Sequence, residues 1–202
     1  DNLLTNDESG RPTGDGAAYL AGLLRDLPAV AAVTAPSVPS LHRRRPGYFA
    51  GAYAFWGVEN REAPLRYVPT SPLLGPDHAN VELKTVDASA NPYLALTAVL
   101  AAGLAGIEDG LELPEPIQED PGGWGDDERD RRGVSRLATT PDAQESAPPG
   151  AAAAVAAPAT PPSNLGTGLE PESLPAEQAE DILGAPESFR RFGTTPVSEV
   201  TI

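Results

Sequence analysis

Apolar residues recur at helical spacing in two stretches of the chain. In the first, Asp15 can cap a helix whose apolar positions end before Pro28. These positions are Tyr19, Leu20, Leu23, Leu24 and Leu27. In the second, Asn91 is the expected N-cap, Pro92 takes the first helical position, and Gly110 marks the C-terminal stop. The apolar positions between them are Leu94, Leu96, Val99, Leu100, Leu104 and Ile107. The pattern predicts two helices, the second of them long.

Between these helices the pattern changes to that of strands. Residues 51–58, GAYAFWGV, are apolar throughout and predict a buried strand. Residues 64–68, PLRYV, predict another strand, with proline at its start because proline cannot donate to a sheet ladder. In residues 79–87, Val81, Leu83 and Thr85 alternate with Glu82, Lys84 and Val86, which predicts a strand with one polar face. Successive strands before a long helix indicate an α+β fold with antiparallel strands and packed helices.

The second half of the chain differs from the first in charge and composition. Residues 1–110 carry a net charge of -4 and residues 111–202 a net charge of -11, within a total of -15. The stretch APPGAAAAVAAPATPPS, residues 147–163, cannot bury enough varied apolar surface to pack. We therefore expect an ordered domain over residues 1–140 and a low-complexity, largely disordered Pro/Ala-rich tail over residues 141–202.

Charge and composition also limit the partners of the chain. A net charge of -15 argues against nucleic acid, because phosphate backbones favour a basic surface. The dense basic run RRR, residues 43–45, precedes Pro46-Gly47 and predicts a solvent-facing turn. No apolar run approaches the ~20 residues that span a bilayer. The absence of cysteine excludes disulfides and thiolate chemistry. We expect a cytoplasmic protein without a nucleic-acid or membrane partner.

Charged residues gather at the ends of the predicted strands. Glu82 and Lys84 are two apart on one strand, so their side chains project from the same face. Arg61 and Arg66 are five apart, but Pro64 favours a bend that would let both point at one place. Three cations and a carboxylate suit a phosphorylated ligand plus a metal, because arginine grips phosphate with two parallel bonds and glutamate can hold Mg²⁺. An ordinary salt-bridged surface is the alternative, and the spacing leaves the choice open.

The order of these motifs resembles one known family. NVELKTVDASANPYLALTAVLAAGLAGI, residues 80–107, resembles the glutamine synthetase segment in which a metal-binding glutamate on a strand precedes D-x-x-A-N-P-Y-L and a long helix. RRRPGYFAGAYAFWGVENREAPLR, residues 43–66, resembles the preceding family segment, R-x-x-P-G followed by N-R-x-x-x-x-R. Residues 1–30 are similar to the stretch after the family's H-x-H motif, and GDDERDRRGVSRLATT, residues 125–140, to the region after the helix. The resemblance covers about residues 1–135 and lapses from about 141.

The resemblance implies a role for each matching position. Arg43 would contact the amino-acid substrate. Arg61, between substrate and ATP phosphates, and Arg66, in contact with ATP, are the expected catalytic residues. Glu82 matches a metal-binding glutamate. Lys84 stands where many members have an arginine that holds the substrate carboxylate, so the charge is kept but the bidentate fork is lost.

The family chemistry explains why arginines would gather beside a buried strand. Members transfer the γ-phosphoryl group of ATP to the side-chain carboxylate of glutamate, and an amine or ammonia then displaces phosphate to give an amide. Such a transfer needs positioned charge, supplied by guanidinium groups and by Mg²⁺ (or Mn²⁺). The resemblance therefore implies a ligase that uses glutamate, ATP and an amine, in a ring-shaped homo-oligomer.

The acceptor is expected to be an organic amine. Members that use ammonia carry a glutamate after P-G, as in P-G-x-E-A-P, whereas this chain has PGYFAG with Phe49 in that place. An aromatic side chain cannot deprotonate ammonium but offers an apolar wall for a carbon-bearing amine. The surrounding sequence also resembles the γ-glutamylpolyamine synthetase branch. The alternative is that Phe49 only packs against other aromatic residues and that the acceptor is ammonia.

Two further readings stay open. The sequence has no methionine at position 1, and the family's Asn-Gly and H-x-H segments and paired glutamates would precede Asp1. We therefore expect this chain to be a fragment that does not catalyse ligation alone. A non-catalytic remnant, or a nucleotide-binding regulatory module that uses the arginines without catalysis, are the alternatives from other functional classes.

Overall fold

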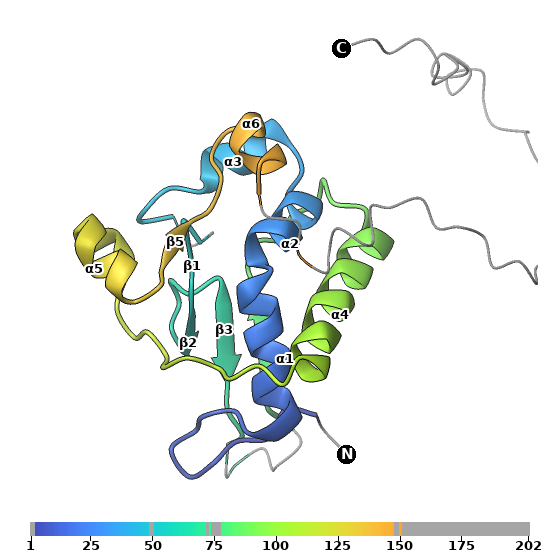
Figure 1. Cartoon of the computed structure of the whole chain (residues 1–202), viewed down its shortest axis with the longest axis vertical. Helices are drawn as coiled ribbons and strands as arrows, with labels where there is room; N and C mark the ends of the chain where they lie inside the picture. Colours follow the sequence, from blue (N-terminus) through green and yellow to red (C-terminus); the bar gives the residue numbers. More distant parts are fainter. Residues whose placement is uncertain (1–2, 49–50, 72, 74–77, 148–149, 151–202) are drawn as a thin grey trace, which may run out of the picture. The chain divides into compact units, whose positions relative to one another are not determined.

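The computed structural model describes residues 3–48, 51–71, 73, 78–147 and 150, and it has the predicted α+β architecture (Figure 1). Its helices are α1 (Gly14–Arg25), α2 (Leu27–Thr34), α3 (Val38–Arg43), α4 (Pro92–Glu108), α5 (Asp126–Arg131), α6 (Pro141–Glu145) and the short 3-10 helix η2 (Pro121–Gly123). Its strands are β1 (Tyr53–Ala54), β2 (Trp56–Val58), β3 (Leu65–Val68), β4 (Asn80–Leu83) and β5 (Ser135–Arg136). Helix α1 lies between the strands and α4 (Figure 1).

The first predicted helix is present, but the chain continues helically past its expected end. Helix α1 ends at Arg25, and α2 begins at Leu27 after a bend of 72°. Pro28 lies in the first turn of α2. Backbone N–H groups in the first turn of a helix have no helical acceptor, so a proline there costs no hydrogen bond. Proline therefore starts a second helix here instead of only stopping the first. In the described part of the chain no single helix is long and apolar enough to cross a membrane, although α1 and α2 together pass by length and composition.

The predicted apolar strand over residues 51–58 divides between two sheets. Strand β1 pairs antiparallel with β5, whereas β2 joins β3 and β4 in a three-stranded sheet. Strands β3 and β4 are antiparallel, as expected, and Arg66 lies opposite Glu82 in their register. Strands β2 and β3 are parallel, with Gly57 opposite Arg66, so this sheet is mixed.

A tight loop accounts for the parallel pair. Glu59 has a φ of 53°, a left-handed conformation that turns the chain directly after β2. Its N–H donates to the carbonyl of Tyr67 over 2.8 Å, and the loop over residues 59–64 then returns the chain to the start of β3. Parallel strands normally need a long crossover, which is why the sequence favoured an antiparallel arrangement here.

Helix α4 has the predicted ends but an unexpected buried face. Asn91 caps it, because Asn91 Oδ1 accepts hydrogen bonds from the N–H groups of Tyr93 and Leu94 over 3.0 and 3.3 Å. Gly110 follows its end with a φ of 61°. The residues buried against the rest of the unit are small: Ala95, Ala98, Ala102, Gly103 and Gly106. These small side chains let α1 approach closely.

The apolar core has two parts. The larger joins α1, α2, α4 and the mixed sheet around the fully buried side chains of Leu20, Leu27, Trp56, Leu65 and Tyr67. The smaller joins the residues around β1 to the segment before β5, and consists of Ala52, Tyr53, Phe55, Ala63, Ile117 and Val134. The loop between β2 and β3 lies where these two cores meet, which gives it a rigid base.

A buried arginine connects the C-terminal part of the described unit to its helices. Arg44 is 2% exposed, so the predicted solvent-facing turn over residues 43–45 is wrong at its centre. Its Nη1 donates to Ala138 O and Gln144 Oε1 over 2.9 Å each, and its Nη2 donates to Ala31 O over 2.8 Å. Burial lowers the pKa of Arg44 below its ordinary value.

The predicted domain boundary at residue 140 stays a prediction. Helix α6, with Gln144, lies just beyond it and packs near α2. The predicted disordered tail lies outside the described residues from residue 151 onward.

Candidate functional site

Two cationic residues are positioned by the loop between β2 and β3 and by β3 itself. Arg61 is exposed in the loop, directly after Asn60, whose side chain is buried. Asn60 Nδ2 donates to Ile117 O over 2.8 Å, and Asn60 Oδ1 accepts from the N–H of Glu62 over 2.9 Å. Arg66 lies on β3, between fully buried Leu65 and Tyr67. The arginines are thus held by a hydrogen-bonded loop and a core strand.

Arg66 and Glu82 form an ion pair across neighbouring strands. Arg66 Nη1 donates to both Glu82 carboxylate oxygens over 3.1 Å. The antiparallel register places these residues directly opposite each other. Arg66 Nε is buried and has no hydrogen-bond partner among the described residues. This N–H is closed off from solvent, so a ligand could reach Arg66 only through the outer part of its guanidinium group.

Lys84 joins this group from the end of β4. Its Nζ donates to the carbonyl of Arg61, and its N–H donates to Pro64 O over 2.9 Å. Burial lowers the pKa of Lys84, with the charge of Arg66 acting in the same direction and that of Glu82 opposing it. The structure therefore brings together Arg61, Arg66, Glu82 and Lys84, the four residues that the sequence placed at one site.

Arg43 reaches the same neighbourhood through a small pocket. A pocket of about 10 Å³ is lined by Ala35, Ser40, Arg43, Arg44, Lys84 and Thr85. Thr85 is 4% exposed, and its hydroxyl has no hydrogen-bond partner among the described residues. A space of this size admits a water or a single ligand atom. Two of the three predicted substrate-binding cations, Arg43 and Lys84, thus border one pocket.

Asp87 is a partner of Arg43 that sequence reasoning missed. Asp87 Oδ2 forms an ion pair with Arg43 Nη2 and accepts a hydrogen bond from Ser40. Asp87 Oδ1 accepts from the N–H of Ser89 over 2.8 Å, as in an Asx turn. Burial alone would raise the pKa of Asp87, but the bonds from Ser40 and Ser89 and the charge of Arg43 together lower it to about 2. The motif Asp87-x-Ser89 was the available signal.

Glu82 fits a divalent metal as one ligand. Its carboxylate is 45% exposed at the edge of the arginine group. Three-residue clusters of His, Asp and Glu that could hold a metal ion are absent from the described part of the chain. Mg²⁺ commonly takes one or two carboxylates and completes its shell with water and substrate phosphates. Glu82 therefore suits a metal that is shared with a phosphorylated ligand.

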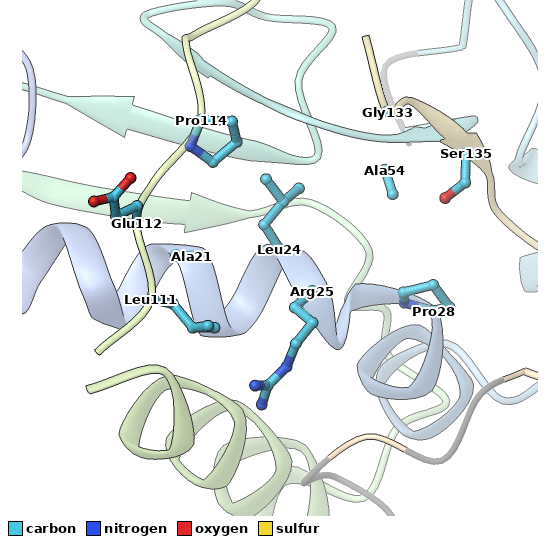
Figure 2. A pocket seen from close by; sticks show the side chains of 10 residues that line it. All are labelled: Ala21, Leu24, Arg25, Pro28, Ala54, Leu111, Glu112, Pro114, Gly133 and Ser135. Carbon is cyan, nitrogen blue, oxygen red and sulfur yellow. The ribbon is translucent and has the colours of Figure 1, made fainter. Parts of the chain in front are cut away.

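The remaining features lie apart from this group. Phe49, the predicted acceptor-specificity residue, lies outside the described residues. A separate pocket of about 350 Å³ is bordered by α1, the segment after α4 and the β1–β5 sheet (Figure 2). Leu24 and Pro114 face each other across it, while the Arg25 guanidinium points away toward α4 (Figure 2). None of the predicted site residues lines this second pocket.

Comparisons with known proteins show which family this chain is similar to. Residues 1–147 match the model of the glutamine synthetase catalytic domain. The chain is 45% identical over 128 residues to gamma-glutamylpolyamine synthetase of Streptomyces coelicolor, which covers 63% of this chain and 28% of that protein. It is 42% identical over 122 residues to a glutamine synthetase of Staphylococcus epidermidis, which covers 60% of this chain and 26% of the relative.

Two solved structures are also similar to this chain. A glutamine synthase homolog has a TM-score of 0.55 and 34% identity, over 70% of this chain and 30% of that one. A complex of GmaS with ADP has a TM-score of 0.57 and 26% identity, over 95% of this chain and 42% of that one. The chain thus spans well under half the length of these relatives. With its catalytic-domain match over residues 1–147, the chain belongs to the glutamine synthetase family.

Proposed function

We propose that this segment contributes to an ATP-dependent ligase that joins the γ-carboxylate of glutamate to an amine through a γ-glutamyl phosphate. The observation that carries the proposal is the group of Arg61, Arg66, Glu82 and Lys84 at the β3–β4 edge. A carboxylate is a poor electrophile, and phosphorylation activates it. Positioned cations lower the cost of moving phosphoryl charge. The relative solved with ADP supports a nucleotide as the phosphate source.

The cationic residues would bind the phosphates and the glutamate, and the acidic residues would bind the metal or position a cation. Arg66, whose side chain is 24% exposed, and the exposed Arg61 would hold ATP phosphates, the latter also facing the substrate. Arg43 and Lys84, which border one pocket, would hold the glutamate. A Mg²⁺ or Mn²⁺ ion held in part by Glu82 would neutralise phosphate charge. Asp87 would keep Arg43 in place through their ion pair.

We further propose that the acceptor is an organic amine and that the enzyme works in the cytoplasm as a ring-shaped homo-oligomer. The similarity to a gamma-glutamylpolyamine synthetase supports the amine, as does Phe49, which by the resemblance stands where ammonia-using members carry glutamate. Ammonia is the competing acceptor, because glutamine synthetases are similar to this chain to nearly the same degree.

The test uses a chimera, because the chain spans about a quarter of the length of its curated relatives. Residues 1–147 would replace the matching segment of the Staphylococcus epidermidis enzyme. We expect the chimera to release phosphate from ATP in the presence of glutamate and an amine. Arg66→Ala should then lower kcat by about 100-fold, since a positioned charge is worth about 3 kcal/mol in such a transition state.

One control variant and one further test variant make the result specific. Arg131→Ala changes an exposed arginine of α5 and should leave kcat unchanged. Glu82→Ala should raise the Mg²⁺ concentration that gives half-maximal activity. An active chimera that is indifferent to both Arg66→Ala and Glu82→Ala would contradict the proposed roles. The 202-residue chain by itself should release no phosphate above background, and robust turnover would contradict that expectation.

A further inference from the structure

The small pocket beside Arg43 lies between the end of α3 and the residues that follow β4. Its volume is about 10 Å³, and the residues that line it are Ala35, Ser40, Arg43, Arg44, Lys84 and Thr85. All of these except Arg43 and Lys84 are at most 4% exposed. A space of this volume is at the lower limit for one water molecule and excludes a larger group. The pocket is therefore part of the interior of the described unit, whatever covers the outer surface of that unit.

Thr85 brings an unpaired polar group to this pocket. Thr85 is 4% exposed, and its hydroxyl oxygen is buried without a hydrogen-bond partner among the described residues. Its carbonyl oxygen is satisfied, because it accepts from Thr34 Oγ1 over 3.1 Å. A buried hydroxyl without a partner is destabilising, and nearly all such groups in folded proteins are paired with protein or with ordered water. The pocket that Thr85 lines is therefore the place to look for the missing partner.

The neighbouring residues can bind the same partner. Arg43 Nη2 pairs with Asp87, which leaves the other guanidinium N–H groups of Arg43 as donors. Lys84 Nζ donates to the carbonyl of Arg61 and carries further N–H groups. Ser40 Oγ donates to Asp87 Oδ2 and can still accept a hydrogen bond. The lining thus offers both donors and acceptors, which suits a small molecule that accepts and donates.

Charge and volume limit what can occupy the pocket. The residues that line it include three cations and no carboxylate, so a metal ion does not suit it. A phosphate or carboxylate group has several heavy atoms and exceeds the volume. A chloride ion matches the charge, but it cannot donate a hydrogen bond to Ser40 or Thr85. Water fits both the volume and the mixture of donors and acceptors.

We propose that this pocket binds one water molecule, which pairs with the Thr85 hydroxyl and joins α3 to the end of β4. Thr85 is then a positioning residue, because it acts through the water on the spacing between Arg43 and Lys84. The water site itself does not depend on the ligase activity. Its effect on glutamate rests on the proposed function, in which these two cations hold that substrate.

The number of long-lived water molecules in the 202-residue chain tests the site. Oxygen-17 magnetic relaxation dispersion counts water molecules that stay bound for longer than the protein takes to rotate, and proton exchange of hydroxyl groups does not affect it. Thr85→Val keeps the branched shape of the side chain and removes the hydroxyl, so we expect the count to fall by about one. The midpoint of denaturant unfolding should fall as well, because a hydrogen bond is lost.

Thr34→Val is the matched control. Thr34 is fully buried, and its hydroxyl donates to the carbonyls of Val30 and Thr85 over 2.9 and 3.1 Å. This variant should lower the midpoint and keep the number of bound waters. Thr85→Ser retains the hydroxyl and should also keep that number. A raised midpoint with an unchanged count in Thr85→Val would show that the hydroxyl is unpaired, and the proposal would be wrong. An effect of Thr85→Val that depends on chloride concentration would also overturn it.

A crystal structure of the unmodified chain tests the site without a substitution. It should show a water molecule within hydrogen-bond distance of Thr85 Oγ1, between α3 and the end of β4. A dry pocket at this place would overturn the proposal.

The effect on substrate binding is measured in the chimera described above. We expect Thr85→Val to raise the KM for glutamate about fivefold, the scale of one hydrogen bond, with little change in kcat, and Thr85→Ser to restore the KM. An inactive chimera would count against the proposed ligase alone, because the water count does not require activity. In an active chimera, a lowered kcat with an unchanged KM would contradict the positioning role of Thr85.

Discussion

At the scale of single residues, Asn60 fixes the loop that carries Arg61. Asn60 is 8% exposed, and its side-chain amide forms hydrogen bonds with both the 117–119 segment and the loop itself. Asn60→Ala would leave Ile117 O and the N–H of Glu62 without this partner. We expect it to lower the free energy of unfolding by about 1–3 kcal/mol, measured by denaturant titration. Asn80→Ala, at an exposed asparagine of β4, is the control and should change it by less than about 0.5 kcal/mol.

Asp87 should make the stability of the fold depend on pH in the acid range. Its pKa is lowered from 3.8 to about 2 in the folded chain, so its carboxylate stabilises the fold above about pH 4. That contribution is lost as the pH falls toward about 2. We expect Asp87→Asn to reduce stability at pH 7 by up to about 2 kcal/mol and to equal the unmodified chain near pH 2. Equal differences at both pH values would show that Asp87 acts without its charge.

The sequence predicted some of these residue contacts and missed others for identifiable reasons. Arg66 and Glu82 were expected at one site because they lie on neighbouring predicted strands, and the observed register places them directly opposite each other. Asp87 and Arg43 are 44 positions apart, and their pairing depends on how α3 docks beside the end of β4. Buried Arg44 donates to carbonyl groups of α2 and of the segment before α6. These partners are distant in the sequence, so the local pattern around Arg44 could not predict its burial.

At the scale of elements, local signals fixed the ends of α4 but not its orientation. Asn91, Pro92 and Gly110 act within a few residues, so capping was predictable. The helix is apolar on all sides, so the pattern of its large apolar residues does not identify the face that is buried. Residues 51–58 are apolar throughout, so their sequence does not indicate that the segment divides between two sheets. Because both segments are uniformly apolar, neither the buried face of α4 nor the division of the strand could be predicted.

The contact of α1 with α4 depends on glycine. A Cβ atom at Gly106 would lie 2.3 Å from Ala18 O and 2.7 Å from the Gly22 Cα. Helix propensity alone favours alanine over glycine by about 1 kcal/mol. We nevertheless expect Gly106→Ala to destabilise the fold by about 2 kcal/mol, because the helices must separate. Thermal unfolding checks the sign, with Thr97→Ala on the exposed side of α4 as the control. A raised melting temperature in Gly106→Ala would contradict the close crossing.

At the scale of the whole molecule, the charged group and the contact between α1 and α4 lie on different elements. The charged group occupies the β3–β4 edge and α3, whereas α4 packs against α1 through its small residues. Gly106→Ala should therefore lower stability without removing any charged residue that is proposed to bind phosphate or substrate. The stability prediction and the proposed function can thus be tested separately.

The choice of acceptor is a property of the assembled enzyme and is best measured in the active chimera. By the resemblance to the family, Phe49 stands where ammonia-using members are expected to carry a glutamate that holds and deprotonates ammonium, and we propose that its apolar side chain favours an amine that carries carbon. We expect kcat/KM to be higher for putrescine, spermidine, ethanolamine or methylamine than for ammonium. Phe49→Glu should move the ratio toward ammonium by about tenfold, which corresponds to about 1.4 kcal/mol. If ammonium were preferred to every organic amine with Phe49 present, the acceptor would instead be ammonia, and the remaining proton-accepting group would have to come from elsewhere in the site.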